Sequence, residues 1–173
     1  AEGIPKEAQM DSGSTLTYEN TSKIYEGEGW KIQYHEAGAG EPVIFLHEYG
    51  PGSSAWVNYH KNIGELSKHF RCLMPDVGGT GMTVAPEGTQ GGHERYALTA
   101  LKLMDGLGIE KAHIVGHSSG GTASLLFGYT YPDRVLKVVT GSCHHSRGQS
   151  FPGGEPYMIA NRPSEGNRAT MEV

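Results

Sequence analysis

The sequence predicts an α/β protein whose sheet is mostly parallel, with an antiparallel hairpin at its N-terminal end. Short apolar, β-branched runs, such as residues 43–46, alternate along the chain with stretches of helical periodicity, such as residues 93–107. This alternation is typical of a parallel sheet covered by helices. The hairpin is indicated by alternating apolar and polar residues on both sides of Gly27 and Gly29.

The first part of the chain contains an arm, the hairpin and one buried strand. Residues 1–22 are polar and lack periodicity, which predicts an N-terminal arm. Residues 23–25 and 30–35 form the strands of the predicted hairpin. Residues 42–46 contain the continuous apolar run that is typical of a central strand buried on both faces. We expect one domain core over residues 23–145.

The middle of the chain continues the alternation of helix and strand. A helix is predicted at about residues 56–70, with Ser53 or Ser54 as its N-cap. An apolar strand at residues 71–75 follows and ends in a glycine-rich loop. The apolar spacing of residues 93–107 predicts the next helix.

A strand, a sharp turn and a helix are predicted around Ser118. The apolar run 113–115 stops at Gly116, and a helix is expected over residues 122–129, before Pro132. The five turn residues fit the G-x-S-x-G nucleophile elbow, reading Gly116-His117-Ser118-Ser119-Gly120. One more apolar strand is predicted at residues 134–140, and residues 146–173 are expected to be a loop or the start of a lid.

The elbow motif explains its own glycines. A serine on so tight a turn takes a strained backbone conformation, and side chains at positions 116 and 120 would collide with the neighbouring strand and helix. Ser118 would then project its hydroxyl above the sheet. The backbone N–H of Ser119, at the N-terminus of the helix, would point to where an oxyanion forms.

The same turn has two other interpretations. A glycine- and serine-rich turn without function fits the five residues alone, but the strand before it and the helix after it favour the elbow. A phosphate-binding loop is disfavoured because Thr122 stands where that motif needs lysine, and the sequence contains no G-x-G-x-x-G.

Composition excludes several classes of partner. The chain has 173 residues, 14 Lys and Arg against 19 Asp and Glu, and a net charge of -5, which argues against nucleic acid and against acidic membranes. Two cysteines and the lack of an N-terminal apolar segment predict a cytoplasmic protein. We expect no cofactor and no metal, because neither H-E-x-x-H nor C-x-x-C is present.

Several residues at or near predicted strand ends have both a functional and a structural interpretation. His117 either lines a pocket or is a satisfied polar group, and His47 either hydrogen-bonds within the loop after its strand or has a purely structural role. Asp76 is interpreted as a turn-stabilising carboxylate rather than a catalytic one. Trp56 and Tyr59 form an aromatic wall or simply pack their helix.

Three stretches resemble a known family: residues 34–41 before the buried strand, residues 47–59 after it, and residues 104–109 before the elbow. Together with the elbow, they resemble the α/β-hydrolase fold, and within it the meta-cleavage-product hydrolases. Those enzymes split a carbon-carbon bond in 2-hydroxy-6-oxo-dienoates. The resemblance covers the N-terminal portion of that fold only, so its C-terminal strands are expected to be missing here.

The resemblance implies roles for particular residues. Ser118 would be the nucleophile or the residue that activates water, and the N–H groups of Tyr49 and Ser119 would form the oxyanion hole. Further substrate contacts would come from Gly50, Trp56, Asn58, which would touch the dienoate head, and His117. The sequence departs from the family where Glu48 and Tyr49 replace glycines and His117 replaces asparagine.

The triad acid and histidine of the family have no match in family context. In this fold they follow the serine on loops after later strands. The histidines after Ser118 are His144 and His145, which come after a strand beside the elbow strand and are possible bases. Three explanations stay open: a fragment, a second chain that completes the sheet, as in a homo-oligomer, and a non-catalytic remnant. The first is favoured.

These observations predict a serine hydrolase that acts on a small-molecule carbonyl substrate. By resemblance, the reaction is carbon-carbon bond hydrolysis of a 2-hydroxy-6-oxo-dienoate type compound. The alternatives are an esterase or lactonase of the same fold, and a ligand-binding domain that lacks the acid and the histidine.

Overall fold

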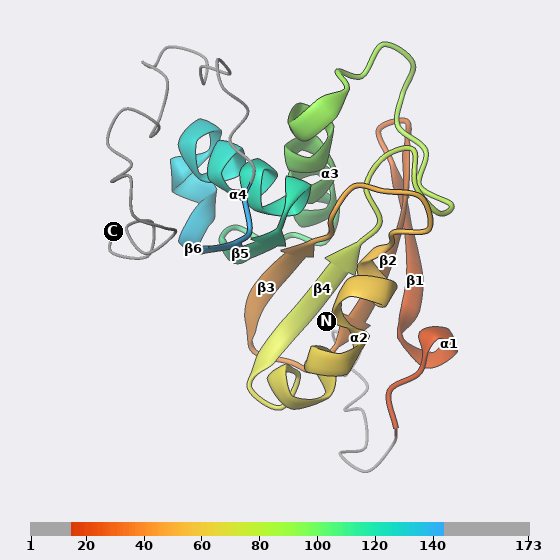
Figure 1. Cartoon of the computed structure of the whole chain (residues 1–173), viewed down its shortest axis with the longest axis vertical. Helices are drawn as coiled ribbons and strands as arrows, with labels where there is room; N and C mark the ends of the chain where they lie inside the picture. Colours follow the sequence, from red (N-terminus) through yellow and green to blue (C-terminus); the bar gives the residue numbers. More distant parts are fainter. Residues whose placement is uncertain (1–14, 144–173) are drawn as a thin grey trace, which may run out of the picture.

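Six strands form one mixed sheet in the computed structural model, which describes residues 15–143 (Figure 1). Their order across the sheet is β1-β2-β4-β3-β5-β6. β2 pairs antiparallel with β1 and β4, whereas the pairs β3–β4, β3–β5 and β5–β6 are parallel. This confirms the predicted mostly parallel sheet with an N-terminal hairpin. The strands are β1 (Ser22–Gly27), β2 (Trp30–Ala37), β3 (Glu41–Leu46), β4 (Phe70–Pro75), β5 (Ala112–His117) and β6 (Val135–Gly141).

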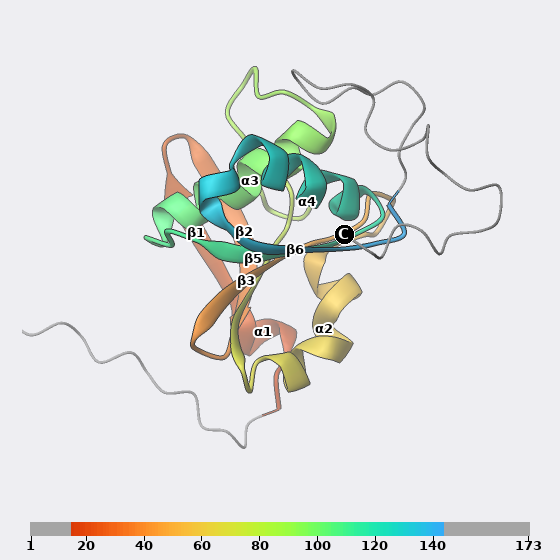
Figure 2. The ribbon, with the colours of Figure 1, turned by 90° about the vertical axis from the view of Figure 1, so that its left-hand side faces the viewer.

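Helices cover both faces of the sheet. Figure 2 shows α3 and α4 on one face and α1 and α2 on the other. β3 lies between β4 and β5 and is therefore covered on both faces, which explains its continuous apolar run. The helical elements are α1 (Tyr18–Thr21), α2 (Ala55–Leu66), α3 (Gly92–Gly106), α4 (Ser119–Thr130) and the 3-10 turn η1 (Pro132–Arg134).

The hydrophobic core is divided by the sheet into two clusters. Ile44 and Leu46 of β3 belong to the cluster under α3 and α4, and Val43 and Phe45 belong to the cluster under α2. This division follows from the alternation of side chains along a strand. Burial of both sets fixes the register of β3. It therefore also fixes the position of the polar residues that follow the carboxyl end of this strand.

The prediction of a helix at residues 56–70 is wrong at its C-terminal end. α2 ends at Leu66, and Phe70 instead begins β4, where it pairs with Glu41. Pairing with the central strand competes with the helix for Phe70. The N-terminal end is close to the prediction, because the Ser54 side chain accepts a hydrogen bond of 3.2 Å from the N–H of Val57.

The predicted helix at residues 122–129 also has different bounds. α4 begins at Ser119, three residues earlier, and β5 continues through His117. Gly120 and Gly121 disfavour a helix by propensity, but close packing against the sheet keeps them helical. The strand therefore passes to the helix through Ser118 alone.

The predicted N-terminal arm, residues 1–22, falls largely outside the described residues. Within it, residues 18–21 form α1, which the sequence pattern did not predict. Thr17 and Asn20 form a reciprocal capping box at its start. Residues 146–173, predicted as a loop or lid, lie outside the described part of the chain.

Two further features concern surfaces. β6 is an edge strand of the described sheet, and its Leu136 and Val139 side chains are 40% and 58% exposed. Within residues 15–143, none of the helices combines the length and the apolar character that crossing a membrane requires.

Candidate active site

Ser118 connects β5 to α4 in a strained backbone conformation. Its φ of 54° and ψ of -119° lie in a region that residues other than glycine rarely adopt. The backbone on both sides holds it there: the N–H of Ser118 donates to the carbonyl of Gly141 at 2.9 Å, and its own carbonyl accepts from Thr122 at 3.1 Å. The expected strain at the elbow is confirmed.

The glycines of the elbow are required by contact between backbones. A Cβ atom on Gly116 would lie 2.1 Å from the carbonyl oxygen of Gly120, and one on Gly120 would lie 2.0 Å from the carbonyl oxygen of Leu46. Neither neighbour is a flexible side chain. The predicted collisions with helix and strand are therefore confirmed, and α4 packs directly on the end of β3.

The N-terminus of α4 lies beside Ser118. Ser119 is the first helical residue, so its N–H has no partner within the helix. The Ser118 side chain makes no capping hydrogen bond. This arrangement leaves a hydroxyl, a backbone N–H and the positive end of a helix at one point above the sheet.

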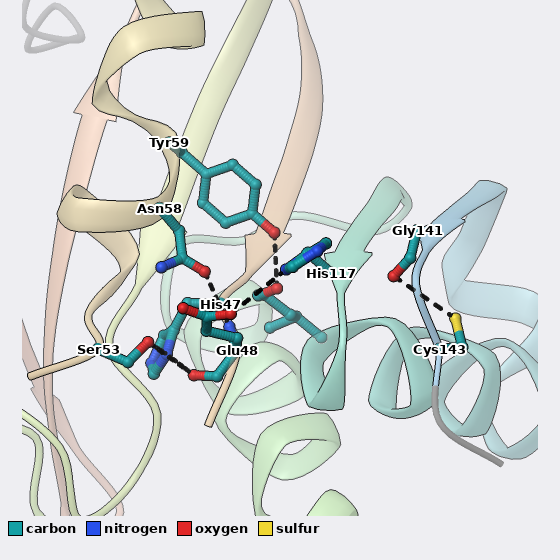
Figure 3. A network of polar contacts seen from close by, with 9 residues as sticks. His47, Glu48, Ser53, Asn58, Tyr59, His117, Gly141 and Cys143 are labelled. Carbon is teal, nitrogen blue, oxygen red and sulfur yellow. Dashed lines mark hydrogen bonds and ion pairs between the residues drawn. The ribbon is translucent and has the colours of Figure 1, made fainter. Parts of the chain in front are cut away.

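The loop after β3, residues 47–50, is held by polar contacts from three directions (Figure 3). The Glu48 carbonyl accepts hydrogen bonds from His47 Nδ1 at 2.6 Å and from the Ser53 hydroxyl at 2.9 Å. The N–H of Glu48 donates to Asn58 Oδ1 at 2.9 Å. Both ends of the Glu48 backbone are thus fixed, and the interpretation of His47 as a hydrogen-bonding group within this loop is confirmed.

His47 is fully buried and bonded through both ring nitrogens. Its Nε2 accepts a hydrogen bond of 3.1 Å from the N–H of Val77, which follows β4. Burial lowers the pKa of His47, the strongest of the influences on it, so the ring is neutral at neutral pH. An accepting Nε2 leaves the proton on Nδ1, and this is the nitrogen that donates to Glu48.

Glu48 and His117, two departures from the family pattern, face each other. Glu48 Oε2 lies 3.6 Å from His117 Nδ1, and both side chains are about half exposed. Figure 3 shows this contact between the loop after β3 and the end of β5. Nearby, the buried Tyr59 hydroxyl donates to the carbonyl of Leu46 at 2.7 Å, and burial raises the pKa of Tyr59. Tyr59 therefore supports the end of β3.

The other residues for which the resemblance implied site roles lie in the loop after β3 and in α2. The amide oxygen of Asn58 binds the Glu48 N–H, so this residue holds the loop. Trp56 packs with the rings of His35 and Tyr18, at centroid distances of 4.9 and 6.0 Å. The Tyr49 side chain is 78% exposed. Gly50 accepts a hydrogen bond from the N–H of Ser53 at 3.1 Å.

Asp76 was predicted to stabilise its own turn, but its side chain binds the start of a different element. Asp76 is buried, and its Oδ1 accepts a hydrogen bond of 2.8 Å from the N–H of Ala55. It therefore caps the N-terminus of α2 from the end of β4. This contact also anchors the helix that carries Asn58 and Tyr59.

The possible bases His144 and His145 lie outside the described residues. Over residues 15–143, no group of three or more His, Cys, Asp or Glu side chains is arranged to hold a metal ion. Ser53, which sequence reasoning considered only as a helix cap, donates to the Glu48 carbonyl. Its position shortly after an apolar strand is the one signal that could have indicated this contact.

Comparison with known proteins gives one family and a consistent set of relatives. The family model described as alpha/beta hydrolase fold matches residues 41–163. A 2-hydroxy-6-oxo-2,4-heptadienoate hydrolase from Pseudomonas putida is 38% identical over 111 residues, which cover 64% of this chain and 40% of the relative. A 2-hydroxy-6-oxo-6-phenylhexa-2,4-dienoate hydrolase from Comamonas testosteroni is 41% identical over 132 residues, 72% of this chain and 46% of the relative.

A solved structure agrees with these relatives. A meta-cleavage product hydrolase from Pseudomonas fluorescens IP01, complexed with acetates, has a TM-score of 0.67 and 37% identity, and the match covers 72% of this chain and 46% of that chain. The chain thus spans less than half the length of the relatives that it matches.

Because α4 contacts β3 so closely, a methyl group at Gly120 is expected to lower the free energy of unfolding. Gly120→Ala is expected to destabilise the protein by about 1–3 kcal/mol or prevent folding, because two backbones would have to separate. Gly64→Ala is the control, since a Cβ there meets nothing within 4 Å on the same kind of helix. It should stabilise by about 0.5–1 kcal/mol. Urea unfolding measures both, and equal stability of the two variants would contradict the packing described.

Proposed function

The chain belongs to the alpha/beta hydrolase family, and we propose that it is a serine hydrolase that breaks a carbon-carbon bond in 2-hydroxy-6-oxo-dienoate type compounds. The observation that carries this proposal is the strained Ser118 on its elbow, next to the N–H of Ser119, which has no partner within its own helix. The substrate class comes from relatives at 38–41% identity that are named as hydrolases of such dienoates.

In the proposed reaction, the Ser118 hydroxyl, or a water molecule that it activates, adds to the keto carbon of the substrate. The carbonyl electron pair moves to the oxygen, and the oxyanion is held by the N–H groups of Tyr49 and Ser119. When the carbonyl re-forms, the bond to the neighbouring carbon breaks and its electron pair goes to the dienoate fragment, which takes a proton. The other fragment leaves as a carboxylic acid, after hydrolysis of an acyl-enzyme if serine attacked.

The proposal requires a general base and an acid that orients it. We propose that His144 or His145, more of the polypeptide, or a second copy supplies the base. The mass of the protein distinguishes these sources: a longer polypeptide has a greater chain mass, and a second copy gives an oligomer. His144 and His145 are candidates because they follow β6, the neighbour of β5 in the sheet.

We propose that residues close to Ser118 contact the substrate. His117 is half exposed at the end of β5, beside Ser118, and Gly50 lies in the loop that carries Tyr49. Glu48 would oppose a nearby developing negative charge, and its carboxylate lies 3.6 Å from His117 Nδ1. For Asn58 and Trp56 we propose indirect roles, through the loop and through the packing of α2.

We further propose a cytoplasmic location and a covered edge at β6. Cys72 and Cys143 are free thiols, which suits a reducing compartment. Leu136 and Val139 are apolar and exposed on the edge strand, and such an edge tends to pair with another strand. The covering strand comes from more of the polypeptide or from a second copy.

Substitution of the proposed nucleophile tests the reaction. Ser118→Ala is expected to lower kcat for a 2-hydroxy-6-oxo-dienoate by at least about 1,000-fold, because the group that forms or activates the nucleophile is gone. The fading of the conjugated dienoate's absorbance measures the rate.

The control is the adjacent Ser119→Ala. This change keeps the backbone N–H that the proposal uses, so kcat should stay within about threefold of the parent. If both variants keep full activity, Ser118 has no catalytic role. If the parent itself binds the dienoate without turnover, the chain is a ligand-binding domain and the proposed reaction is wrong.

Native mass spectrometry tests the covered edge. The purified protein should have a mass above the 18.6 kDa of this sequence, either as a longer polypeptide or as an assembly of copies. Replacement of Val139 by Lys would separate an assembly into monomers by placing a charge on the edge. A folded monomer of 18.6 kDa would contradict the covered edge, and if it turned over substrate, His144 or His145 would be left as the source of the base.

A further inference from the structure

We infer that Ser53 and His47 are positioning residues that aim the backbone N–H of Tyr49 into the oxyanion hole. The inference rests on the proposed function, in which this N–H stabilises the oxyanion. It concerns one peptide unit, the Glu48–Tyr49 peptide, whose orientation decides whether a donor or an acceptor faces the reacting carbonyl.

The Glu48 carbonyl and the Tyr49 N–H belong to the same peptide plane. The peptide bonds of the described residues are trans, so these two groups point in opposite directions. The carbonyl is held by two donors, His47 Nδ1 at 2.6 Å and the Ser53 hydroxyl at 2.9 Å. Whatever fixes this carbonyl also fixes the direction of the Tyr49 N–H.

The direction is toward the elbow. Figure 3 shows Ser53 and His117 on opposite sides of Glu48. The carbonyl accepts from Ser53, so the N–H of Tyr49, on the opposite side of the same peptide, is directed away from Ser53 and toward the end of β5, which Ser118 follows in the sequence. The contact of Glu48 Oε2 with His117 Nδ1, at 3.6 Å, places the loop against this side independently.

His47 can hold the carbonyl only in one protonation state. Its Nε2 accepts from the N–H of Val77 at 3.1 Å, so the donor to Glu48 must be a protonated Nδ1. The ring is fully buried and packs on Tyr96 with ring centroids 5.7 Å apart. The tautomer is therefore set by the end of β4, one strand away from β3.

Little else holds this peptide unit. The Tyr49 side chain is 78% exposed, and Gly50 and Gly52 follow it, each with nothing within 4 Å of a Cβ position. If the carbonyl lost its donors, the peptide could rotate and present the Glu48 oxygen to the substrate. An oxygen acceptor in that place would repel the developing oxyanion.

Removal of the Ser53 hydroxyl is the test. Ser53→Ala is expected to lower kcat for a 2-hydroxy-6-oxo-dienoate about fivefold with KM unchanged, since one net hydrogen bond of the two is lost. Ser53→Thr keeps a hydroxyl and should restore kcat. Ser54→Ala is the matched control: it removes the N-cap bond of the same helix but no bond to Glu48, and should leave kcat unchanged.

Amide and imidazole NMR of the same proteins provides a readout that does not need turnover. We expect His47 Nε2 to be unprotonated in the parent, and the Tyr49 amide signal to broaden in Ser53→Ala but not in Ser54→Ala. If the parent shows no turnover while these signals behave as expected, the proposed function fails, and only the positioning of the Glu48–Tyr49 peptide by Ser53 and His47 holds. An unprotonated His47 Nδ1, or an unchanged Tyr49 signal in Ser53→Ala, would overturn the inference.

Discussion

Backbone atoms of α4 lie against backbone atoms of β3 at Gly120, and the site depends on this contact. A Cβ on Gly120 would be 2.0 Å from the Leu46 carbonyl oxygen, so no other residue fits without movement. The contact brings the first turn of α4 over the ends of β3 and β5. It also leaves a single residue, Ser118, to connect strand and helix, which explains its φ of 54°. Strain at the serine follows from the packing.

A second constraint comes from buried polar groups at the ends of β3 and β4. Each must find a partner, because an unsatisfied polar group in the interior is costly. His47 satisfies the Val77 N–H and the Glu48 carbonyl together, and Asp76 satisfies an N–H at the start of α2. These bonds link β4, the loop after β3 and α2 into one unit. Hydrogen bonds rather than packing within the loop therefore hold the loop beside Ser118.

The sequence predicted the parts of the fold that depend on local chemistry. The run at residues 42–46 indicated the central strand, and Gly116 and Gly120 indicated the elbow, because each feature has a physical reason within a few residues. The end of α2 was missed because pairing of Phe70 with Glu41 is non-local. The start of α4 was predicted too late because Gly120 and Gly121 have a low helix propensity, which contact with β3 overrides.

The candidate site was predicted in part for the same reason. Ser118, Ser119 and the hydrogen-bonding His47 follow from motif and position. The partners of Asp76 and Asn58 do not, because the hydrogen bonds that they form with Ala55 and Glu48 span 21 and 10 residues of sequence. Ser53 looked like a helix cap, whereas the cap is Ser54 and Ser53 binds Glu48. Long-range polar contacts leave little trace in a single sequence.

Covalent labelling tests whether Ser118 is an activated nucleophile on its elbow. A fluorophosphonate probe reacts fastest with a serine that is both activated and faced by oxyanion donors, so it examines the elbow and the loop together. The account predicts one adduct per chain, located on Ser118 by peptide mass spectrometry and lost in Ser118→Ala. A folded protein that stays unmodified, or an adduct on another serine, would contradict it.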